Sequence, residues 1–224
     1  YLKDGVLRDY ALIGPARIKA LAAKFDEAEA MLREILQHVP EQVEAHALLG
    51  HVVVERRDAE KFRAWREALP PAADQHPEIW FAKGNWAENH GEPEGAARCY
   101  WETIRLDPSH LKANFRLSRL LVALGKPQEA EPFAKRAELL DRLLQVLSKL
   151  YEHREQQLEK DQMQQAAELC ESLGRIWEAW AWYSLIQVAD PDDETTKQAV
   201  DRLTSKINEN PPLTVPDAHP ANRV

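Results

Sequence analysis

The residue types that most often carry chemistry in proteins occur in this chain, but their spacing does not form a catalytic pattern. His46 and His51 lie five residues apart on one predicted helix, whereas two histidines that share a metal ion on a helix are usually four apart. Cys99 and Cys170 are the only cysteines, and both fall beside apolar neighbours in predicted helices, which favours packing over nucleophilic chemistry. We therefore expect no catalytic residues, no metal site and no cofactor.

Known catalytic motifs lead to the same expectation. The sequence contains no Gly-x-Ser-x-Gly turn, no glycine-rich loop that would cradle a phosphate, and no His-Glu-x-x-His pattern. The carboxylates, for example Glu27, Glu29 and Glu34 around Arg33, are interpreted as charges on a helix surface. These observations predict that the chain is not an enzyme.

Composition limits the class of protein and the kind of partner. The 224 residues are 44% apolar, which is enough for the core of one domain or of two small ones. Only eight residues are glycine, and Ala, Leu, Glu and Gln outnumber β-branched residues, which favours a mostly helical fold. The net charge of −8 excludes bulk attraction to nucleic acid, and no apolar run approaches the length needed for membrane insertion.

Small residues and helix breakers recur along the chain with a period of 34 residues. The clearest copy contains Trp80, Gly84, Gly91, Ala96, Tyr100 and Pro108. A shift of 34 residues brings Ser118 and Gly125 to the positions of Gly84 and Gly91, and the opposite shift brings Gly50 to the position of Gly84. A fifth copy, with Gly174 at the turn position, follows the fourth at an offset of 49 residues.

Each copy predicts two antiparallel helices. Small residues such as Gly50 and Gly84 let the first helix approach its partner closely, and the glycines at 91, 125 and 174 permit a left-handed turn after that helix. Prolines 40, 108 and 191 stop the second helix. Because one helix pair cannot bury its apolar face alone, neighbouring pairs must stack.

This pattern resembles the tetratricopeptide repeat (TPR) family over roughly residues 9–191. The resemblance implies an all-α, right-handed α-solenoid of about five helix pairs, with a long inserted helical extension and a C-terminal capping helix. The expected divisions are 1–8 as the end of an upstream element or an N-terminal cap, 9–207 as the repeat domain, and 208–224 as a proline-rich tail or linker. Within the domain we expect units at 9–42, 43–76, 77–110, 111–144 and 160–193, a helical insertion at 145–159 and the capping helix at 193–207.

Two segments depart from the repeat. In the second unit, Arg57 stands at the turn glycine, and a helix at about 58–69 should be followed by an irregular connector, with Phe62 and Trp65 in the core. An apolar stripe over residues 139–151 runs into the insertion. Two interpretations of this region stay open, a solvated helix extension and a homodimer or partner contact through the leucine stripe.

Near the C-terminus, Trp177, Trp180 and Trp182 lie close together. Since Trp180 and Trp182 cannot both face inward on one helix, we expect at least one of them to pack under the capping helix or against a partner.

In the TPR family, side chains of the first helix of each pair line a concave groove that holds peptides or partner domains. Carried over by register, this resemblance places eight residues of this chain in the groove: His51, Phe81, Asn85, Glu88, Lys112, Phe115, Arg116 and Arg119. Val54 should line it as well, and Phe81 and Phe115, at equivalent positions, should form one apolar floor.

Some family members clamp the C-terminal carboxylate of heat-shock chaperones with Lys, Arg and Asn residues. Lys112 and Arg116 match the last pair of that clamp, but Ala47, His51 and Ala82 replace its other members. The resemblance therefore implies a weaker site in which Lys112, Arg116 and Arg119 attract an acidic peptide or a carboxylate, and a solvated basic face is the alternative.

The predicted function is that of a scaffold that binds a peptide or partner protein in the groove. The alternative is a non-catalytic repeat module of a larger multidomain enzyme or of a secreted bacterial protein with a β-propeller, which a start at Tyr1 and the proline-rich tail would fit. A stand-alone adaptor is expected in the cytoplasm, and a module of the larger protein in the periplasm or outside the cell.

Overall fold

The computed structural model describes the backbone of residues 4–152 and 159–209, and side chains within these ranges from residue 13 on. All regular secondary structure in these ranges is helical, as the sequence predicts. The chain forms two compact units, residues 1–134 and 135–224. The predicted tail from residue 210 on and the middle of the predicted insertion lie outside the described residues.

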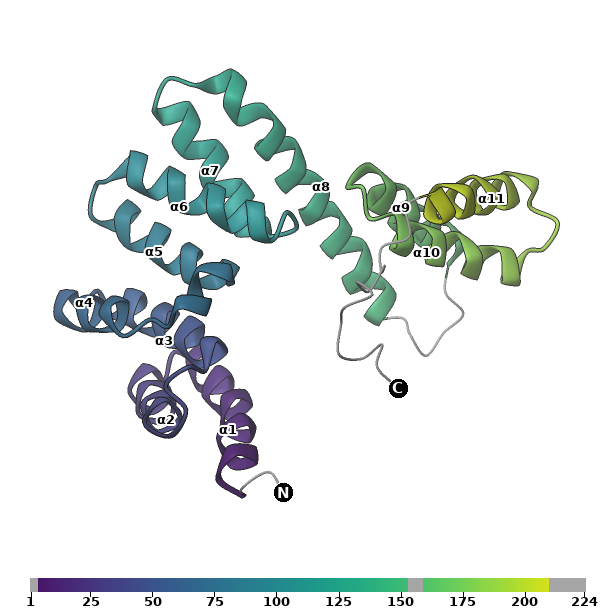
Figure 1. The fold of residues 1–224 in the computed structure, drawn as a ribbon. Helices are drawn as coiled ribbons and strands as arrows, with labels where there is room; N and C mark the ends of the chain where they lie inside the picture. Colours follow the sequence, from purple (N-terminus) through teal and green to yellow (C-terminus); the bar gives the residue numbers. More distant parts are fainter. Residues whose placement is uncertain (1–3, 153–158, 210–224) are drawn as a thin grey trace. The chain divides into compact units, whose positions relative to one another are not determined.

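Antiparallel helix pairs that pack side by side build the first unit (Figure 1). Its helices are α1 (Asp4–Leu21), α2 (Phe25–His38), α3 (Val43–Arg56), α4 (Ala59–Glu67), the 3₁₀ helix η1 (Pro71–Gln75), α5 (Pro77–Asn89), α6 (Pro93–Leu106), α7 (Leu111–Ala123) and the start of α8 (Pro127–Glu152). The pairs α1–α2 and α5–α6 pack closely, and α2 and α6 each pack on the first helix of the next pair. This is the stacking that the repeat predicts.

The second unit contains the remainder of α8, followed by α9 (Lys160–Ser172), α10 (Ile176–Ala189) and α11 (Glu194–Glu209). Helix α10 packs on α9 and on α11, so the predicted capping helix covers α10. The indole Nε1 of Trp180 donates a hydrogen bond to Thr204 Oγ1 of α11 at 3.0 Å. This contact confirms that one of the clustered tryptophans packs against the C-terminal helix.

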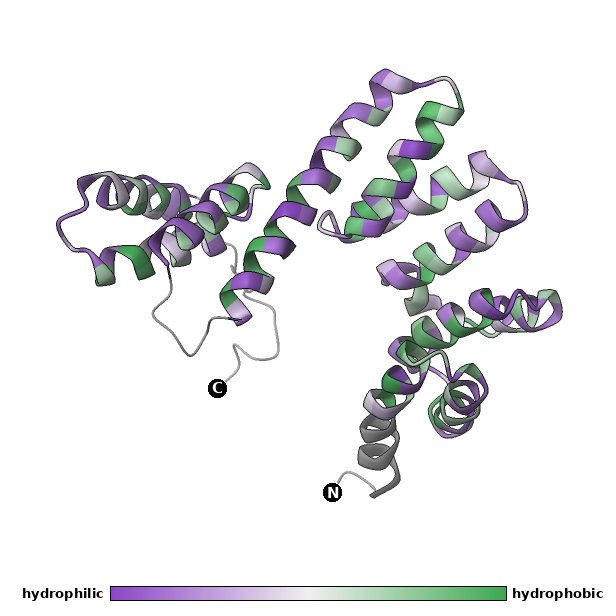
Figure 2. Ribbon diagram, turned by 180° about the vertical axis from the view of Figure 1, so that it is seen from behind, coloured by the Kyte–Doolittle hydropathy of each residue, from purple (hydrophilic) through white to green (hydrophobic). Residues whose placement is uncertain are grey.

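The sequence signals for helix ends operate as expected. Helices α5, α6 and α8 begin with Pro77, Pro93 and Pro127, at the position where a missing N–H costs nothing. Gly91, Gly125 and Gly174 take positive φ angles of 73°, 76° and 77° in the turns that follow α5, α7 and α9. Figure 2 shows apolar and polar residues alternating along the helices, as amphipathic packing elements require.

Arg57 adopts the left-handed conformation of the turn glycine it replaces, with φ of 55°. This conformation is strained for a residue with a Cβ. We expect Arg57→Gly to raise the free energy of unfolding by up to about 1 kcal/mol, since relief of strain outweighs the added freedom of the unfolded chain. Urea titration followed by circular dichroism measures the change. Ala23→Gly, at φ of 56°, should shift stability in the same direction, and a loss of stability in both variants would contradict this explanation.

The small residues at the helix crossings do allow close approach. A Cβ at Gly50 would lie 2.4 Å from the Trp65 ring, and a Cβ at Gly84 would lie 2.7 Å from the Tyr100 ring. Trp65 is held against α3 because its Nε1 donates to the backbone oxygen of His46 at 2.9 Å. Phe62 and Trp65 are both buried, as predicted for the second repeat, which departs from the pattern.

The connector at the end of the second repeat is more regular than expected. Helix α4 ends at Glu67, and the segment predicted to be irregular contains η1, whose Ala73 is buried. Prolines 70 and 71 explain the difference, because they restrict the backbone and Pro71 occupies the first position of the short helix.

The leucine stripe of residues 139–151 is largely covered within the chain. Leu140, Leu143, Val146 and Leu150 are buried, whereas Leu144 and Tyr151 are exposed at 56% and 67%. Homodimerisation through this stripe stays a prediction. The two exposed residues are the ones that such a contact would use.

Glu29 is not the surface charge that the sequence suggested. It is only 6% exposed, and its carboxylate accepts hydrogen bonds from Lys61 Nζ at 2.8 Å and from Arg33 Nε at 2.9 Å. Burial raises the pKa of this carboxyl, but the hydrogen bonds from Lys61 and Arg33 outweigh it and hold the pKa below the ordinary value. Glu29 thus ties α2 to α4.

We expect Glu29→Gln to lower the free energy of unfolding by about 2 kcal/mol at neutral pH, because Lys61 loses its buried partner. Since the folded pKa is depressed, this stabilisation is fully present above the unfolded value of about 4.5 and is lost as pH falls through the folded value. Urea titrations at pH 7 and pH 3.5 should show the gap between wild type and variant closing in acid. A matched change in an exposed ion pair, Glu60→Gln, should be nearly neutral at both pH values.

Candidate functional site

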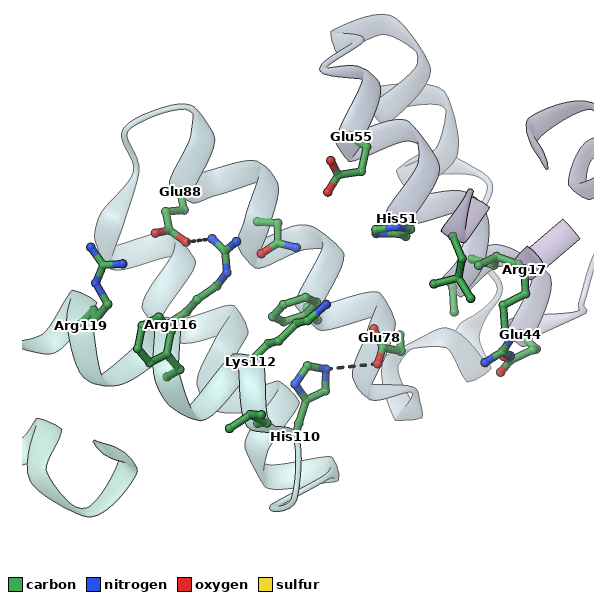
Figure 3. Close-up of a pocket in the computed structure, with 17 residues that line it drawn as sticks. Arg17, Glu44, His51, Glu55, Glu78, Glu88, His110, Lys112, Arg116 and Arg119 are labelled. Carbon is green, nitrogen blue, oxygen red and sulfur yellow. Dashed lines mark hydrogen bonds and ion pairs between the residues drawn. The ribbon is translucent and has the colours of Figure 1, made fainter. Parts of the chain in front are cut away.

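A groove of the first unit is lined by the first helices of successive repeats and has a volume of about 860 Å³ (Figure 3). Helices α3, α5 and α7 supply most of its lining, and Arg17 and Leu21 of α1 contribute at one end. All eight residues that the sequence places in the groove line it: His51, Phe81, Asn85, Glu88, Lys112, Phe115, Arg116 and Arg119. Val54 does not, because its side chain is buried in the core.

The lining follows the repeat register. Three lining positions recur from repeat to repeat, and residues at equivalent positions are 34 apart. These sets are Glu44, Glu78 and Lys112; Ala47, Phe81 and Phe115; and Arg17, His51, Asn85 and Arg119. Our sequence reasoning missed Arg17, Glu44 and Glu78, although the same 34-residue shift would have found them.

The floor of the groove offers less aromatic surface than expected. Phe81 is 8% exposed, and its ring packs against Tyr100 and His110, with centroids 5.6 and 4.5 Å away. Phe115 is 51% exposed. The expected shared floor is therefore reduced to one exposed ring, that of Phe115.

A hydrogen-bonded network spans α5, α6 and α7 beside this ring. Arg116 Nη1 donates to Glu88 Oε2 at 2.7 Å, and the Tyr100 hydroxyl lies 2.7 Å from both Glu88 Oε2 and Asn85 Oδ1. Burial and then the hydrogen bond to Glu88 raise the pKa of Tyr100, so the phenol keeps its proton. Burial lowers the pKa of Arg116, but the hydrogen bond to Glu88 outweighs it and raises the value. Arg116 is thus already partnered inside the groove.

Two acidic groups of α3 and α5, Glu44 and Glu78, are also partnered. Glu44 forms an ion pair with Arg17 and accepts a hydrogen bond from His76 Nε2 at 3.1 Å. Glu78 lies 3.2 Å from His110 Nε2, and this hydrogen bond, more than burial, sets the lowered pKa of Glu78. His110 Nδ1 accepts from the N–H of Ala113 at 3.1 Å, so Nε2 carries the proton that His110 donates to Glu78.

Three charged side chains of the groove have no ion-pair partner among the described residues: Lys112, Arg119 and Glu55. Lys112 and Arg119 lie on α7, and the Arg119 guanidinium lies 5.6 Å from the centroid of the Phe115 ring. Glu55 lies on α3, across the groove in Figure 3. The groove therefore presents two cations beside an exposed aromatic ring on one wall and a carboxylate on the other.

Comparison with known families decides what kind of repeat this is. Two models, each described as tetratricopeptide repeat, match residues 20–85 and 81–142, which together make up more than half of the chain. The chain belongs to the tetratricopeptide repeat family. The matched range contains α3, α5 and α7 in full and the last two residues of α1.

Solved structures share the fold. A thermophilic TPR protein from Thermus thermophilus aligns with 88% of this chain and 99% of its own, at 15% identity and a TM-score of 0.50. PilF of Pseudomonas aeruginosa aligns with 91% of this chain and 100% of its own, at 17% identity and a TM-score of 0.53. At such identities the likeness extends to the fold alone. No curated protein matches the sequence.

TPR repeats are protein-interaction modules, and proteins built from them are generally non-catalytic scaffolds. In this TPR chain His46 has a structural role, because it is buried and its Nε2 donates to the backbone oxygen of Pro40 at 2.8 Å. Burial lowers the pKa of His46, which favours the neutral ring. None of the described helices has the length and apolar character of a membrane span.

Proposed function

We propose that the groove of α3, α5 and α7 binds an extended peptide segment of a partner protein and holds a carboxylate of that segment at Lys112 and Arg119. The observation that carries this proposal is the pair of cations that have no ion-pair partner among the described residues and lie on α7 with the exposed ring of Phe115. Arginine and lysine bind carboxylates by charge-assisted hydrogen bonds, and the ring adds apolar surface for a neighbouring side chain. Arg116 contributes less to the binding of this carboxylate than the sequence suggested, since its guanidinium already forms an ion pair with Glu88.

The free carboxylate of Glu55 favours a bipolar peptide. A ligand that lies across the groove would present a carboxylate to α7 and a basic group toward α3. Of the remaining acidic groups on α3 and α5, Glu44 is ion-paired with Arg17 and Glu78 is hydrogen-bonded to His110, so both attract a further cation less strongly. The ligand class is therefore an extended peptide with acidic and basic ends around an apolar centre.

Titration of a labelled, end-blocked peptide into the full chain tests this function. The probe carries two aspartates at one end, leucine in the centre and lysine at the other end; the control replaces the charged residues by Asn and Gln. We expect the bipolar probe to bind more tightly by about tenfold, equivalent to about 1.4 kcal/mol, with affinity falling as salt rises. Phe115→Ala should weaken both peptides. Equal, salt-independent binding of the two peptides would overturn the proposal.

Glu88→Gln should tighten binding of the bipolar probe by about three- to tenfold, because it removes the internal counter-ion of Arg116 and frees that guanidinium for the ligand. Anisotropy titrations of wild type and variant measure the change. Glu55→Gln is the matched control on the other wall, and it should weaken the bipolar probe while sparing a probe without lysine. An affinity of Glu88→Gln at or below wild type would show that Arg116 does not face the ligand.

A further inference from the structure

A second cleft, separate from the groove, lies between α4, α5 and α6 and has a volume of about 520 Å³. None of its lining residues also lines the groove. Its lining includes Phe62 and Arg66 of α4, Trp80, Lys83 and Trp86 of α5, and Arg98 and Trp101 of α6. The volume falls within the range of ligand-binding clefts in proteins.

The cleft exists because the second repeat departs from its neighbours. Helices α2 and α6 pack along the first helix of the following repeat, but α4 packs on α3 and diverges from α5 (Figure 1). Helix α4 ends early, and η1 instead contacts α3 and α5. The Phe62 and Trp86 rings bridge the divergence, stacking with centroids 4.1 Å apart at an interplanar angle of 6°.

The walls of the cleft are unusually aromatic for an exposed surface. Trp101 is 47% exposed, whereas the Trp86 ring stacks on both Phe62 and His90, with centroids 4.1 and 4.0 Å away. The repeat pattern assigns no role to Trp86, which the structure packs against the edge of the core. Tryptophan and arginine are the residues most enriched where partner proteins bind.

The cleft carries positive charge on a chain whose net charge is −8. Among the described residues, Arg66 and Arg98 have no ion-pair partner and are exposed. Lys83 lies 4.3 Å from the Trp80 ring centroid and 3.5 Å from Asp74, so it is largely satisfied within the chain. Of the two acidic lining residues, Glu102 is bound by Arg105 at 2.7 Å, which leaves Glu92.

We propose that this cleft is a second docking site, which binds an extended acidic segment of a partner protein in which an apolar residue is flanked by carboxylates. The apolar residue packs against the exposed ring of Trp101, beside Trp86, and the flanking carboxylates pair with Arg66 and Arg98 on the two sides of the cleft. Charge complementarity selects this occupant, because two unpartnered guanidinium groups flank the aromatic base. The site would let the repeats engage a partner at two separate surfaces.

The test uses the full, ¹⁵N-labelled chain and the end-blocked peptide Asp-Glu-Pro-Leu-Pro-Glu-Asp. We expect the indole N–H signals of Trp80, Trp86 and Trp101 to shift on titration while those of Trp177, Trp180 and Trp182 stay in place. Arg66→Glu with Arg98→Glu should reduce the affinity of this peptide at least about tenfold, and Trp101→Ala should reduce it as well. Lys112→Glu with Arg119→Glu in the groove is the matched control and should leave the cleft shifts unchanged.

Two further peptides discriminate other occupants. A Lys-Arg-Pro-Leu-Pro-Arg-Lys peptide should not compete, and equal binding by it would overturn the assignment of an acidic partner. A peptide of this chain's own residues 208–224, which holds four prolines and one aspartate, should bind more weakly than the acidic probe. Tighter binding by this peptide would overturn the proposal in favour of a second copy or an internal contact. Retention of the acidic peptide by the Arg66→Glu, Arg98→Glu variant would also overturn it.

Discussion

Gly50→Ala should lower the free energy of unfolding by about 2–3 kcal/mol, the largest effect expected of so small a change in this chain. The added methyl would lie 2.4 Å from Cζ2 of Trp65, and the ring cannot move away without losing its hydrogen bond to His46. Overpacking and the lost hydrogen bond together cost about 3–4 kcal/mol, which outweighs the roughly 1 kcal/mol that alanine gains over glycine in a helix. Urea unfolding followed by circular dichroism measures the loss.

A double-mutant cycle tests the cause. In a Trp65→Leu background the clash is absent, so Gly50→Ala should become neutral or stabilising. Gly95→Ala is the matched glycine control, because the nearest atom to its Cβ is an ordinary 3.7 Å away, and it should not destabilise. An equal loss in both backgrounds would show that close approach to Trp65 is not why position 50 is glycine.

Reversal of the two free cations of the groove, Lys112→Glu with Arg119→Glu, should weaken the bipolar peptide by about 10- to 100-fold. Both side chains are exposed and have no ion-pair partner among the described residues, so the variant replaces attraction by repulsion and should leave the fold intact. Lys135→Glu with Arg142→Glu on α8 makes the same change in net charge at the same seven-residue spacing, and neither residue lines the groove or the second cleft. That control should alter groove affinity less than about twofold, through long-range charge alone. Equal losses in the two variants would mean that net charge, not the groove, drives binding.

The repeat register explains why the lining of the groove could be predicted from sequence. Residues 34 apart occupy equivalent positions, so the placement of Phe81 also fixes that of Phe115. Left-handed turns and helix stops follow from glycine and proline, whose backbone restrictions act locally. The fold could therefore be predicted, because the same local signals recur in successive repeats.

The pairing of charges could not be predicted in the same way. Whether Arg116 is free depends on its distance to Glu88, 28 residues earlier on another helix. The sequence predicts that Glu29 is a surface carboxylate, but in the fold α4 places Lys61, 32 residues away, next to it. The cleft of Trp86 and Trp101 arises from the divergence of α4 from α5, which an early helix end suggests but does not determine.

Photo-crosslinking of the bipolar peptide to the full chain is the most direct test of the central claim that the α3, α5 and α7 groove is the working surface. The central leucine of the probe is replaced by a photoreactive residue, and crosslinked peptides are identified by mass spectrometry. We predict crosslinks within α3, α5 and α7 around Phe115, which disappear in the Lys112→Glu, Arg119→Glu variant. Crosslinks confined to other helices, or unchanged by that variant, would contradict this claim.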